Sequence, residues 1–171
     1  MKVLVTYFSQ SGNTEKIAKA IYEEAAKAHT AELKKLEDVS PDEAAGYDVL
    51  FIGSPLHSAN LAAPVKECLG ALKPAAGRKM ALFITHFAPA YPGQEMDEFA
   101  EPAKAACEKN GMEYKGCFDC QGYLADALHE MVKNKIGLDD EAWAGMVEQM
   151  TGRPNGEDEA NAQAFAKTVL D

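Results

Sequence analysis

Apolar runs of strand length recur along this chain and alternate with stretches of helical spacing. Continuous apolar runs predict strands over residues 2–8, 47–53, 79–86 and 113–120, and a weaker alternating run over residues 31–37 predicts an edge strand. Helical periodicity predicts helices over residues 13–28, 62–72, 94–110, 124–135, 139–150 and 157–170, with a short helical turn in SPDEAAG. The pattern therefore predicts strands that are joined mostly by helices.

The runs VLVTYF and DVLFIG lack the alternation of a strand with one wet face. Such runs are typical of central strands in a parallel sheet that helices cover on both faces. Five strands of this kind, joined by helices, predict an α/β fold with a doubly wound five-stranded parallel sheet. At 171 residues, we expect residues 1–171 to form a single domain.

Charge and composition limit the classes of molecule that this protein is expected to bind. The formal net charge is −10, with a calculated pI near 4.9, which opposes binding to nucleic acid. Residues 137–171 contain eight acidic and two basic side chains, which suits docking to a basic protein partner. The chain has no apolar run of the length that a transmembrane helix needs and no signal-peptide pattern, so we expect a cytoplasmic protein that does not enter membranes.

The first predicted strand passes into a helix through a loop of small polar residues. A helix N-terminus offers unsatisfied N–H groups and the positive end of a dipole, which together hold a phosphate without lysine or arginine. Glycine in this loop lets the backbone approach a ligand closely, and hydroxyl and amide groups add donors. The alternative is an ordinary helix cap, which uses the same residue types. The candidate phosphate ligands are Ser9, Gln10, Ser11, Gly12, Asn13 and Thr14.

Two more loops follow the strands predicted over residues 47–53 and 79–86. In doubly wound sheets ligands bind outside the carboxyl ends of the strands, so these loops and the first predict one cofactor cleft. Their small polar, apolar and aromatic residues suit the walls of a pocket for a flat, mostly apolar ring. Plain connections over the core are the alternative. The candidates are Ser54, Pro55, Leu56, His57, Ser58 and Asn60 in one loop and Thr85, His86, Phe87, Ala88, Tyr91 and Gly93 in the other.

The four cysteines and the late methionines have simpler interpretations. Cys117 and Cys120 form a CxxC pattern inside a predicted strand, where alternate side chains point to opposite faces. We therefore expect the two sulfurs on opposite sides of the sheet, which disfavours a redox or metal pair. Met131, Met146 and Met150 are expected to fill the core.

The stretch FSQSGNT resembles the phosphate-binding motif of flavodoxins, T/S-x-T/S-G-x-T, at Ser9, Ser11, Gly12 and Thr14. YDVLFIGSP resembles the third strand of that family and GRPNGEDEANAQAFAKTV the start of its last helix, so the similarity extends over nearly the whole chain. The resemblance implies strand order 2-1-3-4-5 and FMN at the switch point. It places the first loop at the FMN phosphate and the other two beside the isoalloxazine ring.

The resemblance has one departure and leaves the function open. Many flavodoxins stack a tryptophan and a tyrosine on the flavin, but the only tryptophan here, Trp143, lies in a late predicted helix. The stacking candidates are instead Leu56 or His57 on one side and Phe87 or Tyr91 on the other.

An FMN-binding electron carrier with basic redox partners is the favoured function. GSPLHSANLAAPVKECL also resembles a loop of NADPH-dependent FMN reductases, so a flavin-dependent NAD(P)H:quinone or FMN-reductase-type oxidoreductase is the alternative. Residues 121–156 would then form an acceptor pocket or a dimer face. A signalling module without flavin is disfavoured, because the first strand ends in Phe8, Ser9 and Gln10 and not in an acidic cluster.

Overall fold

The structure is a computed structural model that describes residues 1–88 and 96–171. Its centre is a parallel sheet with strand order β2-β1-β3-β4-β5, which confirms the predicted fold class and the order that the flavodoxin resemblance implied. Strands β1 and β3 lie side by side at the switch point. The strands are Lys2–Tyr7 (β1), Thr30–Lys35 (β2), Val49–Pro55 (β3), Lys79–His86 (β4) and Glu113–Gln121 (β5).

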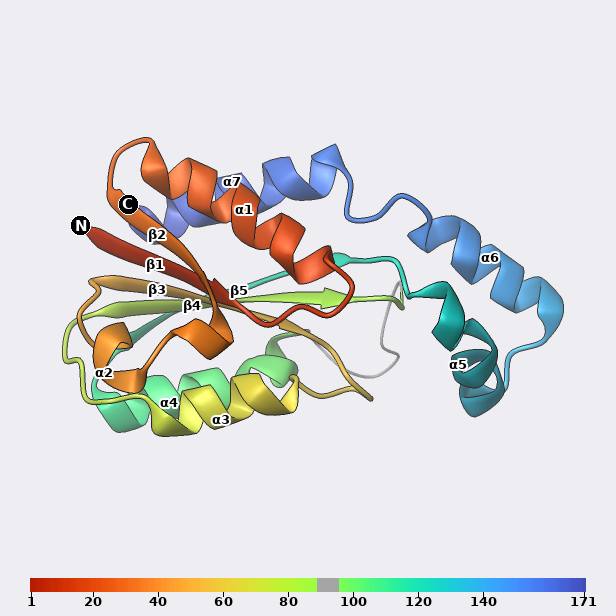
Figure 1. The fold of residues 1–171 in the computed structure, drawn as a ribbon, viewed down its shortest axis with the longest axis horizontal. Helices are drawn as coiled ribbons and strands as arrows, with labels where there is room; N and C mark the ends of the chain where they lie inside the picture. Colours follow the sequence, from red (N-terminus) through yellow and green to blue (C-terminus); the bar gives the residue numbers. More distant parts are fainter. Residues whose placement is uncertain (89–95) are drawn as a thin grey trace.

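Helices cover both faces of this sheet. In Figure 1, α1 and α7 lie on one face and α3 and α4 on the other, whereas α5 and α6 project beyond the carboxyl ends of the strands. We call residues 122–155, between β5 and α7, the α5–α6 excursion. The helices are Asn13–Ala26 (α1), Pro41–Ala44 (α2), Ala63–Ala71 (α3), Glu101–Asn110 (α4), His129–Ile136 (α5), Asp140–Met150 (α6) and Gly156–Leu170 (α7), and 3-10 turns span Leu36–Asp38, Met96–Ala100 and Asp126–Leu128.

The sheet separates two apolar cores. On β3, Leu50 and Ile52 pack with α3 and α4, and Val49 and Phe51 pack with α1 and α7. All four side chains are at most 2 % exposed, which explains why the sequence of this strand shows no alternation. Complete burial of a side chain such as Phe51 stabilises the fold by about 1.5–3 kcal/mol. The central strands thus hold the loops at the carboxyl edge on a rigid base.

Two predicted helices begin later than their patterns suggest. The pattern over residues 94–110 becomes α-helical only at Glu101, after a 3-10 turn, with Pro102 in the first turn of α4. Proline fits that position because first-turn N–H groups have no partner within the helix. The pattern over residues 124–135 likewise passes through a 3-10 turn before α5 begins at His129. In the described part of the chain, no helix combines the length and apolarity that crossing a bilayer requires.

The cysteine prediction is confirmed, and one methionine prediction is wrong. Cys117 packs on the α3–α4 side of the sheet and Cys120 on the α1–α7 side, and burial raises the pKa of the Cys120 thiol. Met150 is fully buried and Met146 half-buried, but Met131 is 59 % exposed. The core assignment of Met131 fails because α5 buries none of its residues.

Candidate functional site

The predicted loops meet around a cavity of about 210 Å³ at the carboxyl edge of the sheet. Loop residues after β1, β3 and β4 form three of its sides, as the strand-end rule predicts. The predicted site residues that line the cavity are Gln10, Ser11, Asn13, Thr14, Pro55, Leu56, His57, Thr85, His86 and Phe87.

The first loop is shaped as an anion site at the start of α1. Gly12 is the N-cap, with a left-handed φ of 89°, and no side chain caps the helix. A Cβ built on Gly12 meets no atom within 4 Å, so the loop is open above this residue. The Gly12 N–H donates to the Ser9 hydroxyl at 3.1 Å, which holds the loop in this shape. The geometry leaves the first turn of α1 available to a phosphate.

Two buried hydroxyls meet beneath this loop. The Oγ1 atoms of Thr14 and Thr85 lie 2.8 Å apart, and the two side chains are 1 % and 3 % exposed. Each hydroxyl has one proton, so after one donates to the other the pair has one proton left for a ligand. A Cβ on Gly53 would lie 2.9 Å from Thr14 Cγ2 and 2.2 Å from the ring of Phe83, so only glycine lets the loop settle here.

The loop after β3 is a tight hairpin. Leu56 pairs with Leu61, and the backbones of His57 and Asn60 exchange hydrogen bonds of 2.8 and 3.1 Å. Ser58 and Ala59 at its tip have φ values of 51° and 58°. Primed turns need this conformation, but residues with a side chain adopt it at a cost of about 1–3 kcal/mol each.

Two side-chain contacts fasten the hairpin. The Ser54 hydroxyl accepts a hydrogen bond from the Ala62 N–H at 2.9 Å, and the Lys135 Nζ donates to the Ser58 hydroxyl at 3.2 Å. The first bond ties the hairpin to the start of α3 and the second to α5. The hairpin is therefore held at its base and at its tip.

The end of β4 contributes an oriented histidine. His86 Nδ1 lies 2.6 Å from the Ala88 carbonyl oxygen, which can only accept a hydrogen bond. Its Nε2 lies 2.9 Å from the Asp119 carboxylate on β5. Gln121 Nε2 donates to the Phe87 carbonyl at 2.6 Å. These contacts to β5 fix the ring of His86 and the backbone of Phe87 at the cavity wall.

A fourth side of the cavity comes from the excursion, where the sequence patterns predicted no site residue. Gly122 begins it, and Asn13 Nδ2 donates to the Tyr123 carbonyl at 2.8 Å. A Cβ on Gly122 would lie 2.6 Å from that Nδ2 atom, so glycine permits the contact. Ligands in such sheets bind outside the carboxyl ends of the strands, and this holds for β5 as well, so the segment after β5 could have been predicted as a wall of the cavity. Its lining residues are Gly122, Tyr123, Leu124, Ala125 and Leu128.

An aromatic series connects this wall to α6. The Tyr123 and His129 ring centroids are 5.5 Å apart, and those of His129 and Trp143 are 5.4 Å apart. Trp143 is 9 % exposed, so it anchors the excursion. The Asp126 carboxylate accepts a hydrogen bond from the Tyr123 hydroxyl and raises the pKa of that phenol. The only tryptophan is thus distant from the cofactor loops in sequence but joined to the cavity wall by two ring contacts.

The remaining predicted residues lie around the cavity or outside the described residues. Ser9, Gly12 and Ser54 shape the loops, Ser58 and Asn60 build the hairpin, and the Ala88 carbonyl holds His86. Tyr91 and Gly93 lie outside the described residues. Within the described ranges, no group of three or more His, Cys, Asp or Glu side chains is arranged to hold a metal ion.

Sequence comparison decides the family. A model of the flavodoxin domain matches residues 4–167. The chain belongs to the flavodoxin domain family. It is also similar, at 29 % identity, to the flavodoxin-like domain-containing protein BilS of Clostridioides difficile, over 99 % of this chain and 97 % of that protein. Flavodoxins bind FMN at the switch point, so family membership confirms the cofactor prediction.

Solved structures show the same fold at low sequence identity. Two-electron reduced Megasphaera elsdenii flavodoxin is 23 % identical, with a TM-score of 0.61, covering 98 % of this chain and 99 % of that one. General stress protein 14 of Treponema denticola, solved in complex with FMN, is 14 % identical, with a TM-score of 0.64 and 98 % coverage of both chains.

The residues of this chain fit the parts of FMN. The uncapped start of α1 and the Thr14–Thr85 hydroxyl pair suit a phosphate. Leu56, Phe87 and Leu128 give the cavity apolar lining suited to a flavin ring.

Proposed function

We propose that this protein is an FMN-dependent electron carrier of the flavodoxin type. The observation that supports this most is that the uncapped start of α1, the β3 hairpin and the end of β4 meet at one cavity. This arrangement suits the phosphate and the ring of FMN. Transfer of electrons to a partner needs only close approach to the edge of the ring.

The side chains bind, orient and shield the cofactor. FMN, when bound, supplies one- and two-electron redox chemistry. The N–H groups and hydroxyls of residues 9–14 hold the phosphate, with Thr85 supporting Thr14 from below. Leu56 and His57 on the hairpin and Leu128 on the excursion flank the ring and exclude water. A net charge of −10 disfavours further negative charge on the reduced ring and so lowers its reduction potential.

A flavin-dependent oxidoreductase that reduces quinones or a related acceptor with NAD(P)H is the second candidate. It is favoured by one observation, the apolar wall that the excursion adds beside the flavin loops through Leu124, Ala125 and Leu128. Such a wall would position an acceptor against the ring if the loops moved apart.

A titration followed by a mixing experiment tests both candidates. FMN added to the purified protein is expected to lose its fluorescence and to shift its absorbance bands on binding. The holoprotein is then mixed anaerobically with NADH or NADPH in the absence of a reductase. A carrier keeps its oxidised spectrum for minutes, whereas rapid bleaching would overturn the carrier proposal in favour of the oxidoreductase. Failure to bind FMN would overturn both.

We also propose the class of partner. The formal charge of −10 favours encounter with redox proteins that present a basic surface, because opposite charges raise association rates. This preference predicts electron-transfer rates that fall as salt is added.

A further inference from the structure

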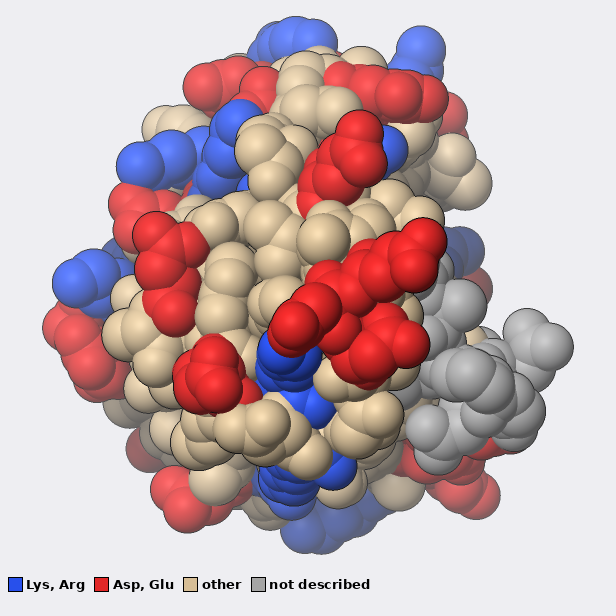
Figure 2. Space-filling view, turned by 90° about the vertical axis from the view of Figure 1, so that its right-hand side faces the viewer, with Lys and Arg blue, Asp and Glu red and all other residues tan. Residues whose placement is uncertain are grey.

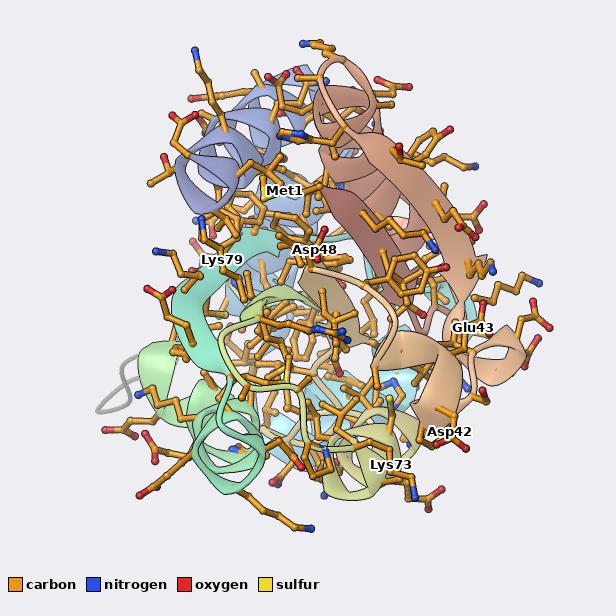
Figure 3. The ribbon with its side chains drawn as sticks, turned by 90° about the vertical axis from the view of Figure 1, so that its left-hand side faces the viewer. Met1, Asp42, Glu43, Asp48, Lys73 and Lys79 are labelled. Atoms are coloured by element: carbon orange, nitrogen blue, oxygen red, sulfur yellow. The ribbon has the colours of Figure 1, made fainter. Side chains whose placement is uncertain are left out.

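Large apolar side chains on α5 and just before it are exposed to solvent. Leu128, just before the helix, is 41 % exposed, Met131 59 % and Ile136 44 %. Among the described residues only Met1 is a further large apolar side chain in this exposed class, and it lies at the opposite end of the molecule, which Figure 3 shows. The helix buries no residue of its own. It therefore presents an apolar surface that no other element of the described chain covers.

This helix is nevertheless held in a defined place. Lys133 pairs with Asp140 at the start of α6, and Lys135 reaches Ser58 at the tip of the β3 hairpin. Trp143 anchors α6 against His129. The exposed side chains thus belong to a fastened element, and their exposure is a feature of the fold.

The apolar surface is continuous with the cofactor cavity. Leu128 lines that cavity with one part of its side chain and remains 41 % exposed. Met131 follows it by three residues, so the two side chains lie on neighbouring positions of one helical face. A molecule that covers this face would therefore reach the mouth of the cavity.

The excursion that carries these apolar side chains is acidic overall. The α5–α6 excursion contains six acidic and three basic residues, and two of the basic ones, Lys133 and Arg153, are ion-paired to Asp140 and Asp158. Figure 2 shows acidic side chains gathered across the middle of the face from which α5 and α6 project. This charge repels a second copy of the chain and an anionic membrane, and it attracts a basic protein.

From these observations we propose that Leu128 and Met131, with the acidic residues of the excursion, form the docking surface for a basic redox protein. The partner presents an apolar patch ringed by lysine or arginine, a match to the apolar side chains and acidic charge of this surface. The inference rests on the proposed carrier function, because it assigns the site at which that carrier meets its partner. We call the surface the α5 docking face.

Cytochrome c, a basic haem protein, serves as the probe. FMN-loaded protein is fully reduced with dithionite, freed of excess reductant and mixed with ferric cytochrome c in a stopped-flow instrument. Two ferric haems accept the two electrons of each fully reduced protein molecule and become ferrous. The second-order rate constant is measured at low salt and at about 0.5 M salt, where surface charges are largely screened.

Three variants locate the surface. Met131→Gln removes the most exposed apolar side chain and is expected to slow transfer about fivefold at both salt concentrations, as for loss of a contact worth roughly 1 kcal/mol. The double variant Glu130→Gln, Glu148→Gln is expected to slow transfer about tenfold at low salt only, since its effect is electrostatic. The control Glu23→Gln, Asp42→Asn removes two exposed acids elsewhere, and Figure 3 labels Asp42 at the opposite end.

The outcomes separate this inference from the proposed function. All variants are expected to bind FMN as the wild type does. If the control slows transfer as much as the Glu130 and Glu148 substitutions, or if Met131→Gln has no effect, the α5 docking face is wrong while the carrier function stands. If the reduced wild type passes no electrons to cytochrome c, the carrier function itself fails. Dimerisation or binding to anionic vesicles that Met131→Gln abolishes would assign the face to another occupant and overturn the inference.

Discussion

The sheet with its covering helices and the α5–α6 excursion are built on different principles. Helix α1 buries Ile17 and Ile21 completely against the sheet, whereas α5 buries nothing and exposes Met131 and Ile136. The first region obtains its stability from packing and holds the phosphate loop rigidly. The second is fastened by a few contacts, so its exposed residues can meet another molecule. The comparison teaches that the chain combines a packed base, which positions the phosphate loop, with a projecting element that adds a cavity wall and leaves apolar side chains exposed.

The largest effect is expected from truncating the core. Phe51→Ala removes a fully buried ring from β3 and is expected to lower the free energy of unfolding by about 3–5 kcal/mol. Met131→Ala, on the excursion, is expected to change it by less than about 0.5 kcal/mol. Urea denaturation followed by circular dichroism measures both. Similar losses from the two substitutions would break the comparison, because they would mean that α5 is packed.

The next effect concerns the phosphate end of the site. Thr85→Val removes the hydroxyl that contacts Thr14. It is expected to weaken FMN binding about tenfold, as for the loss of a hydrogen bond to a charged group, and to change riboflavin binding little. Thr14→Val is expected to act in the same way. Fluorescence titrations with FMN and with riboflavin measure the two dissociation constants and their ratio. Thr85→Ser keeps the hydroxyl and should restore FMN binding, and equal losses for both flavins would show that the pair does not serve the phosphate.

A smaller effect is expected at the ring. Leu128 is the residue that the cavity and the α5 docking face share. Leu128→Ala is expected to weaken FMN and riboflavin alike, by about threefold, because it removes apolar contact with the ring and leaves the phosphate loop intact. The same titrations apply. A loss restricted to FMN would contradict the division of the site between the two regions.

The smallest effect is a pH dependence confined to the excursion. The Asp140 carboxylate raises the pKa of Lys133, and Lys133 lowers the pKa of Asp140. The stabilisation that ionised Asp140 gives to the α5–α6 contact is therefore present above its ordinary pKa and is lost as pH falls through the lowered pKa. The stabilisation from charged Lys133 is lost only when strongly alkaline pH passes its raised pKa. Amide hydrogen exchange should show α5 loosening at acid pH before α1 does. Asp140→Asn should abolish the difference, and uniform loosening of both helices would refute it.

Much of the fold was predictable because it follows from local patterns. Buried central strands such as β3 are apolar on both faces, and a run of small polar residues before α1 marks a strand-to-helix loop in any context. Helix starts were less predictable at α4 and α5, where a 3-10 turn has the same composition as a helix. Met131 was misplaced because an apolar residue at helical spacing is the same in sequence whether its helix packs or projects.

The sequence by itself determined the strands, the alternation with helices and the phosphate loop, since neighbouring residues alone specify these features. Only the tertiary structure decided that the excursion forms a wall of the cavity and leaves α5 exposed. Those outcomes depend on contacts between distant residues, such as Asn13 with Tyr123, 110 positions apart, and Ser58 with Lys135, 77 positions apart. A local sequence pattern does not predict such long-range contacts, because they form only when the folded sheet brings its loops and the excursion together.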